Sequence, residues 1–181
     1  MKTKAIAAAF ALLAFAPSAN AYMYFITEMT TERASIINPQ SVLRSQDGTF
    51  FAPVSVVTQA GDVRIFAYTI DCQGKRMKIS SATDLKMDGG KLVKVAENKA
   101  EQDWRSAKSA PLKSYRELVC GWPSSGAKFG EFDAPDLNEA AAFAAKGVLA
   151  EQERQRWNDK LLQTYQSGNG VSAGMNSKGG K

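Results

Sequence analysis

Three acidic residues at short spacing, Glu97, Glu101 and Asp103, are the best candidates in this chain for acid–base chemistry. Paired carboxylates catalyse hydrolysis when a pocket holds their pKa values apart, so that one donates a proton while the other stays ionised. These three belong to a polar stretch, residues 96–110, which is predicted to be a solvent-exposed loop. We therefore expect ordinary surface carboxylates, and a carboxylate hydrolase is the third of three functional hypotheses.

A second acidic segment, Asp84-Leu85-Lys86-Met87-Asp88-Gly89, has some of the spacing of a calcium-binding loop. Such a loop needs oxygen ligands at alternate positions and a closing glutamate, but here Lys86 takes a ligand position and no glutamate closes the segment. Asp88-Gly89-Gly90 is instead interpreted as a hairpin turn, where glycine accepts the positive φ. The glycine-rich runs also lack the residues of a phosphate-binding loop, so we predict no metal and no cofactor.

The chain contains no histidine and two cysteines, Cys72 and Cys120. Without histidine, neither a Ser-His-Asp nor a Cys-His nucleophile can be built, and most catalytic zinc sites lose their usual ligands. Two cysteines in one exported domain are typical of a disulfide, because compartments beyond the inner membrane are oxidising. We predict a structural Cys72–Cys120 bond and a non-enzymatic protein without catalytic residues.

The first residues of the chain predict export. Lys2 and Lys4 precede an apolar run, residues 5–15, and Ala19-Asn20-Ala21 forms a small-x-small cleavage site. This order of features is typical of a secretory signal peptide, residues 1–21. The apolar run is about half of the ~20 residues that span a bilayer, and no cysteine stands near the cleavage site to carry a lipid. We expect a periplasmic or secreted protein without a transmembrane anchor.

The charge of the chain indicates no nucleic-acid partner. The sequence has 23 Lys and Arg against 18 Asp and Glu, a formal net charge of +5, which becomes +3 when the two lysines of the signal peptide are removed. Charges of both signs are mixed along the chain, whereas nucleic-acid-binding proteins gather basic residues on one face with interleaved aromatics.

Short strands separated by turns are predicted across residues 22–133. Runs rich in β-branched and aromatic residues lie at 22–28, 35–37, 49–58, 63–72, 76–80, 85–87 and 92–95. Pro39 suggests that 35–37 is an edge strand, and Pro53 interrupts the next strand. The run 63–72 is apolar on both faces, as expected for a central strand. Because no helical crossovers separate these runs, we predict an antiparallel meander, followed by a short helix after Pro111.

The last third of the chain predicts a helix, residues 134–166, which starts at Asp136-Leu137-Asn138-Glu139. Its apolar residues form two groups, a first stripe of Leu137, Ala140, Ala141, Ala144 and Val148 and a second patch of Trp157, Leu161, Leu162 and Tyr165. The second patch either packs on the sheet of the same chain or binds a partner or a second copy, with Trp157, Leu161 and Tyr165 as the candidate contacts. Residues 167–181 are rich in Gly, Ser and Asn and are predicted to be disordered.

Residues 22–122 resemble the surface-adhesin protein E family of bacterial envelopes. The resemblance rests on Asn38-Pro39-Gln40-Ser41-Val42, Tyr68-Thr69-Ile70-Asp71-Cys72, Trp104, Pro111-Leu112-Lys113-Ser114 and Val119-Cys120-Gly121. It implies an α+β fold with an antiparallel sheet of about six strands, a packed helix and the same disulfide. It also implies binding to host matrix or plasma proteins and the formation of a homodimer.

Two hypotheses of function precede the hydrolase. The first is a secreted or periplasmic non-enzymatic binding protein of adhesin type, which recognises a protein or envelope component. The alternative is an interaction subunit or inhibitor in a periplasmic assembly that docks through its C-terminal helix. A chain truncated after Asp133 should keep ligand binding under the first hypothesis and lose complex formation under the second.

Overall fold

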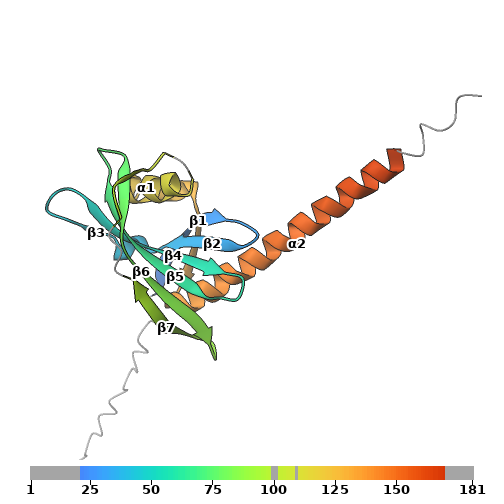
Figure 1. Ribbon diagram of the computed structural model, residues 1–181, viewed down its shortest axis with the longest axis horizontal. Helices are drawn as coiled ribbons and strands as arrows, with labels where there is room; N and C mark the ends of the chain where they lie inside the picture. Colours follow the sequence, from blue (N-terminus) through green and yellow to red (C-terminus); the bar gives the residue numbers. More distant parts are fainter. Residues whose placement is uncertain (1–20, 99–101, 109, 170–181) are drawn as a thin grey trace, which may run out of the picture.

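The computed structural model describes residues 21–98, 102–108 and 110–169 and has the predicted α+β fold (Figure 1). The predicted signal peptide, apart from Ala21, and residues 170–181 lie outside the described residues. The described chain forms one antiparallel sheet, two α-helices and one disulfide. The strands are β1 (Tyr22–Met29), β2 (Arg33–Ile37), β3 (Leu43–Arg44), β4 (Phe50–Thr58), β5 (Val63–Asp71), β6 (Arg76–Asp88), β7 (Lys91–Asn98), β8 (Arg105–Ser106) and β9 (Gly130–Ala134). The helices are α1 (Leu112–Gly121) and α2 (Leu137–Asn169), with short 3-10 turns at Pro39–Ser41 and Gly126–Lys128.

The sheet in the described chain has nine strands, in the order β7-β6-β5-β4-β2-β1-β9, with β3 beside β4 and β8 beside β6. About six were expected. The sequence pattern missed β3 and β8, which have two residues each, and β9, whose residues carry no run of β-branched side chains. The antiparallel meander itself is confirmed, because β4, β5, β6 and β7 pair in chain order.

The strand predicted at 35–37 is not an edge strand. It belongs to β2, which lies between β1 and β4 and is buried from Ala34 to Ile37. Pro39 follows β2 in the 3-10 turn, so it removes no hydrogen bond from the ladder. Pro53 does not interrupt β4 either, because it stands between the last β2 pair, Ile37 with Val54, and the β3 pair, Leu43 with Phe51.

One long strand, β6, replaces the two strands predicted at 76–80 and 85–87. Its register against β5 shifts between Ala67 paired with Ser81 and Tyr68 paired with Ile79, which leaves Ser80 unmatched as a β-bulge. The bulge moves the odd-numbered residues from one face of the sheet to the other. Met77 therefore joins the core on the α1 side, whereas Leu85 packs against the core on the α2 side.

Each face of the sheet carries one helix and one hydrophobic core. The core on the α2 face contains the fully buried Ala140, Ala141, Ala144 and Val148, as the first stripe of the predicted helix requires. The core on the other face places Tyr115, Leu118 and Val119 of α1 against β1, β2, β4, β5 and β6. The central strand β5 contributes to both cores, which confirms that it is covered on both sides.

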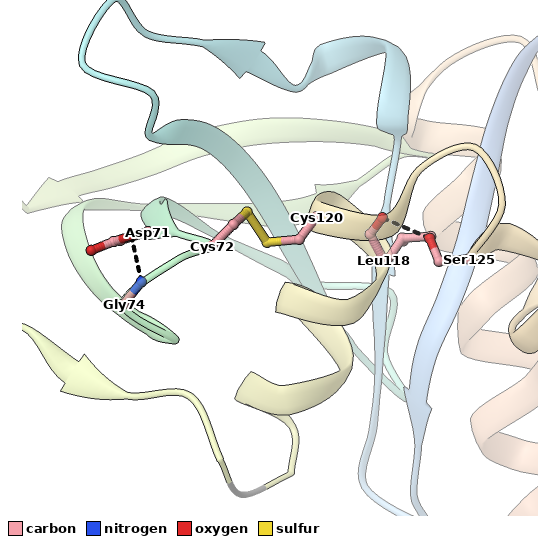
Figure 2. The surroundings of a disulfide bond; sticks show 6 residues. All are labelled: Asp71, Cys72, Gly74, Leu118, Cys120 and Ser125. Carbon is pink, nitrogen blue, oxygen red and sulfur yellow. Dashed lines mark hydrogen bonds between the residues drawn. A yellow bond between two sulfur atoms is a disulfide. The ribbon is translucent and has the colours of Figure 1, made fainter.

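The predicted disulfide joins the end of β5 to the last turn of α1 (Figure 2). Cys72 and Cys120 have Cα atoms 5.7 Å apart and are separated by 48 residues in sequence. Closing a loop of that length contributes about 4 kcal/mol in the chain-entropy model. Next to Cys72, Asp71 Oδ1 accepts a hydrogen bond from the N–H of Gly74 (2.8 Å), and a Cβ at position 74 would lie 2.4 Å from Asp71 Oδ2, so a larger residue there would displace the Asp71 carboxylate.

The helix α2 extends beyond the sheet that its first half covers (Figure 1). It continues to Asn169, so residues 167–169 are helical although the sequence placed them in the disordered tail. Within the described ranges, no helix is both long enough and apolar enough to cross a membrane.

Candidate functional site

The first candidate site is the part of α2 that leaves the body, residues 153–169, which we name the projecting segment. Gln152 makes the last hydrogen bonds before it, from its side-chain amide to the backbone oxygen of Thr31 (2.6 Å) and to Gln59 Oε1 (3.0 Å). From Glu153 to Gln163 every side chain is exposed. The body therefore does not cover the side chains of residues 153–163.

Large apolar side chains lie on the projecting segment without packing against the sheet. Trp157 is 67% exposed, Leu161 45% and Leu162 60%. Trp157, Leu161 and Tyr165 are spaced by four residues and so share one side of the helix; Tyr165 lies in α2, but its side chain is outside the description. Helical geometry places this side roughly 100° or more around the axis from the buried stripe. Trp157 and Leu161 thus face a different direction from the buried stripe, whereas Leu162 lies in line with Ala144, about five helical turns further along.

The charges of the projecting segment are balanced. Glu153 and Asp159 stand among Arg154, Arg156 and Lys160, while Arg154 donates from Nε to Glu151 Oε2 (2.9 Å) one turn earlier. A helix of this length is marginal in water by itself, because nucleation is costly. The packed first half of α2 supplies that nucleus, and so the body holds the projecting segment in helical form.

The second candidate site is a groove of about 650 Å³ on the sheet face that carries α1. The groove lies beside the start of α1, where Pro111 and Tyr115 contribute to its lining, and extends over β4, β5 and β6. Val56, Phe66 and Val95 are among the apolar residues of the lining, which also includes Tyr68 and Tyr115. We name this hollow the sheet groove.

An ion pair lies in the sheet groove between neighbouring strands. Arg64 on β5 donates from Nε and Nη2 to both carboxylate oxygens of Asp84 on β6, the second over 3.0 Å. These hydrogen bonds hold the pKa of Asp84 below its ordinary value. A general acid needs the opposite shift, so Asp84 is not arranged to donate a proton near neutral pH.

A buried chain of hydrogen bonds supports the wall of the sheet groove. Tyr115 on α1 donates to Ser35 Oγ (2.8 Å), and Ser35 donates in turn to Glu28 Oε2 (3.3 Å). Burial raises the pKa of Tyr115 to about 12, although its hydrogen bond with Ser35 acts in the other direction. This chain fixes the ring of Tyr115 against β2, and burial keeps its phenol protonated.

The carboxylates singled out in the sequence are not brought together. Glu97 lies on the exposed strand β7 in an ion pair with Lys94, Asp103 is exposed just before β8, and Glu101 falls outside the described residues. No group of three or more His, Cys, Asp or Glu residues in the described ranges is arranged to hold a metal ion. The segment 84–89 forms the end of β6 and its hairpin turn, as interpreted from the sequence.

The sequence analysis missed the sheet groove. Its walls come from Arg33, at the start of β2, from Tyr115 on α1 and from the hairpin strands β4 to β7. The alternation in β5 could have placed Arg64, Phe66 and Tyr68 on one face, but nothing local shows that α1 stops short of covering them.

Comparison of the chain with models of protein families, with curated proteins and with solved structures gives no match. The resemblance to the protein E family therefore rests on the sequence motifs alone.

Proposed function

We propose that the protein is a secreted or periplasmic, non-enzymatic interaction subunit that docks onto an envelope protein through the projecting segment. The observation that carries this proposal is the exposure of Trp157, Leu161 and Leu162 on a helix that leaves the body. Tryptophan held in place by secondary structure is the side chain most enriched at the centres of protein interfaces. The exported location rests on the predicted signal peptide.

The chemistry of the projecting segment specifies its partner. A helix with apolar side chains at a spacing of four residues binds in a hydrophobic groove of another protein. The mixed, balanced charges around them favour a partner groove with a polar rim of both signs rather than a strongly charged surface. We therefore favour a protein partner over a lipid surface, which selects helices with a basic face.

The adhesin-type function suggested by the protein E resemblance is the second candidate. One observation favours it, namely that the sheet groove offers a ligand a hollow of about 650 Å³ on one face of the sheet. Host matrix proteins as ligands, and a homodimer, follow from the resemblance only.

The truncated chain used in the test must keep the buried residues of α2. Truncation after Asp133 would remove Ala140, Ala144 and Val148 and unfold the body, so a chain that ends at Gln152 is the correct truncation. The full mature chain, the chain ending at Gln152 and the variant Trp157→Ser/Leu161→Ser are crosslinked in the envelope fraction of the source cells. Leu43→Ser, at a leucine on β3 that is 63% exposed against 45% for Leu161, is the control.

The proposal requires one defined protein that is captured by the full chain and by Leu43→Ser but not by the truncated chain or the double variant. That protein, once purified, should bind the full chain with measurable affinity and the double variant at least about tenfold more weakly. Equal capture by all four forms would refute docking through the projecting segment.

A further inference from the structure

The sheet groove contains a phenol hydroxyl that has no hydrogen-bond partner among the described residues. Tyr68 is 6% exposed, and its hydroxyl forms no hydrogen bond with the part of the chain that the structure describes. In that same part, no fully buried side-chain nitrogen or oxygen lacks a partner. The hydroxyl tip of Tyr68 must therefore reach open space, and Tyr68 lines the sheet groove. A nearly buried hydroxyl of this kind is suited to a hydrogen bond with a ligand.

The same groove is lined by Arg33, whose guanidinium forms an ion pair with Glu28. The guanidinium of Arg33 makes no hydrogen bond to the described residues, and Glu28 Oε2, which already accepts from Ser35, is 4.0 Å from its Nε. Arg64 differs, because Asp84 occupies its donors. Burial raises the pKa of Tyr68, and the charges of Arg105 and Arg33 oppose that rise, which agrees with a guanidinium near the hydroxyl.

The rest of the sheet groove suits an apolar body. The ring of Tyr68 lies 6.0 Å from that of Phe66 and 5.7 Å from that of Tyr115, so three aromatic rings follow one another along the wall. Val56 and Val95 extend the apolar lining. A volume of about 650 Å³ is in the range of pockets that hold small molecules.

We propose that the sheet groove binds a small monocarboxylate with an aromatic or aliphatic body, whose carboxylate pairs with Arg33 and accepts a hydrogen bond from Tyr68. The charges of the lining argue for a single negative charge on the ligand. The cations Arg33, Arg64 and Lys86 face the acids Glu32, Asp62 and Asp84, so the lining as a whole is neutral and would not hold a dianion. This site lies on the body and is independent of docking by the projecting segment.

Isothermal titration of the mature, disulfide-bonded protein tests the proposal with two probe pairs. The carboxylates are 2-naphthoate and octanoate, and their neutral controls are 2-naphthamide and octanamide. We expect saturable one-site binding of at least one carboxylate, and binding about tenfold weaker for the amide of the same body, because the charge-assisted hydrogen bonds are lost. Absence of saturable binding of both carboxylates at millimolar concentration would overturn the proposal, as would equal binding of acid and amide.

Two variants locate the bound carboxylate. Tyr68→Phe removes one oxygen atom and keeps the packing, and Arg33→Gln removes the charge; each should weaken carboxylate binding about tenfold. Tyr22→Phe, on an exposed part of β1, and Arg156→Gln, on the projecting segment, are the matched controls and should bind as the wild type does. Wild-type affinity in Tyr68→Phe, which retains the fold, would overturn the assignment even if Arg33→Gln proved unstable.

Discussion

In the first half of α2, residues 137–148, the side chains that pack against the sheet are mostly alanines, and Ala140, Ala141, Ala144 and Val148 are fully buried, whereas Trp157, Leu161 and Leu162 in the projecting segment are large and exposed. Alanine lets a helix approach a sheet closely. Gly147 also lies close to the sheet, since a Cβ there would lie 2.7 Å from Met29 Cε. Trp157 and Leu161 have no such surface opposite them. One continuous helix thus serves as core at one end and as free surface at the other.

Substitutions in the body and in the projecting segment are expected to have different effects on folding. A change to the body should unfold both halves of α2, because the projecting segment is helical only while the packed half holds its first turns. A change to the projecting segment should leave the body intact.

Loss of the disulfide is expected to have the largest effect. Cys72→Ala/Cys120→Ala should lower the free energy of unfolding by about 4 kcal/mol, since the bond closes a loop with a sequence separation of 48. Urea unfolding followed by far-ultraviolet and near-ultraviolet circular dichroism should show helix and tertiary packing lost in one transition. Helical signal that persists after the tertiary signal is gone would mean that the projecting segment is stable without the body.

A matched pair of charge substitutions sharpens the contrast between the two halves. Val148→Asp places a carboxylate in the core between α2 and the sheet, where Val148 is fully buried. It should lower the free energy of unfolding by about 3 kcal/mol. Leu161→Asp places the same group on the exposed segment and should change stability by less than about 0.5 kcal/mol. Thermal and urea unfolding of both variants measures the difference, and similar losses in the two would show that Leu161 is buried in solution.

The start of α2 is expected to give the smallest effect. Asp136 Oδ1 accepts a hydrogen bond from the N–H of Glu139 (3.0 Å), and this bond, together with one from Asn138, keeps the pKa of Asp136 below its ordinary value. Asp136→Ala should lower the free energy of unfolding by about 1 kcal/mol. Asp136→Asn should lower it much less, because asparagine still caps the helix.

The pH dependence of this cap has a defined sign. Because the folded-state pKa of Asp136 is lowered, its stabilisation is complete above the unfolded pKa and is lost as the pH falls through the folded pKa. The stability gap between wild type and Asp136→Ala should therefore narrow between about pH 5 and about pH 2. A gap that stays constant over this range would show that the carboxylate charge contributes nothing to the cap.

The features that the sequence predicts correctly depend on local pattern or on simple pairing. The two apolar groups of α2 are visible in helical spacing alone, and two cysteines allow one intramolecular bond. The features it misses depend on contacts distant along the chain. The hydrogen bond from Tyr115 to Ser35 spans 80 residues, and that the hydroxyl of Tyr68 has no hydrogen-bond partner among the described residues is recognised only when the wall around it is known.

The unmatched Ser80 in β6 determines where this strand tolerates a change of length. In a regular strand every second side chain points to the same face of the sheet. In β6 the bulge at Ser80 interrupts this alternation, so its odd-numbered residues contribute to one core before Ser80 and to the other core after it. Insertion or deletion of one residue elsewhere in β6 would move every side chain between that point and Ser80 to the opposite face of the sheet. Deletion of Ser80 itself would restore a regular ladder at the expense of one of the two cores, so natural variation in length should avoid this strand and concentrate in its flanking turns.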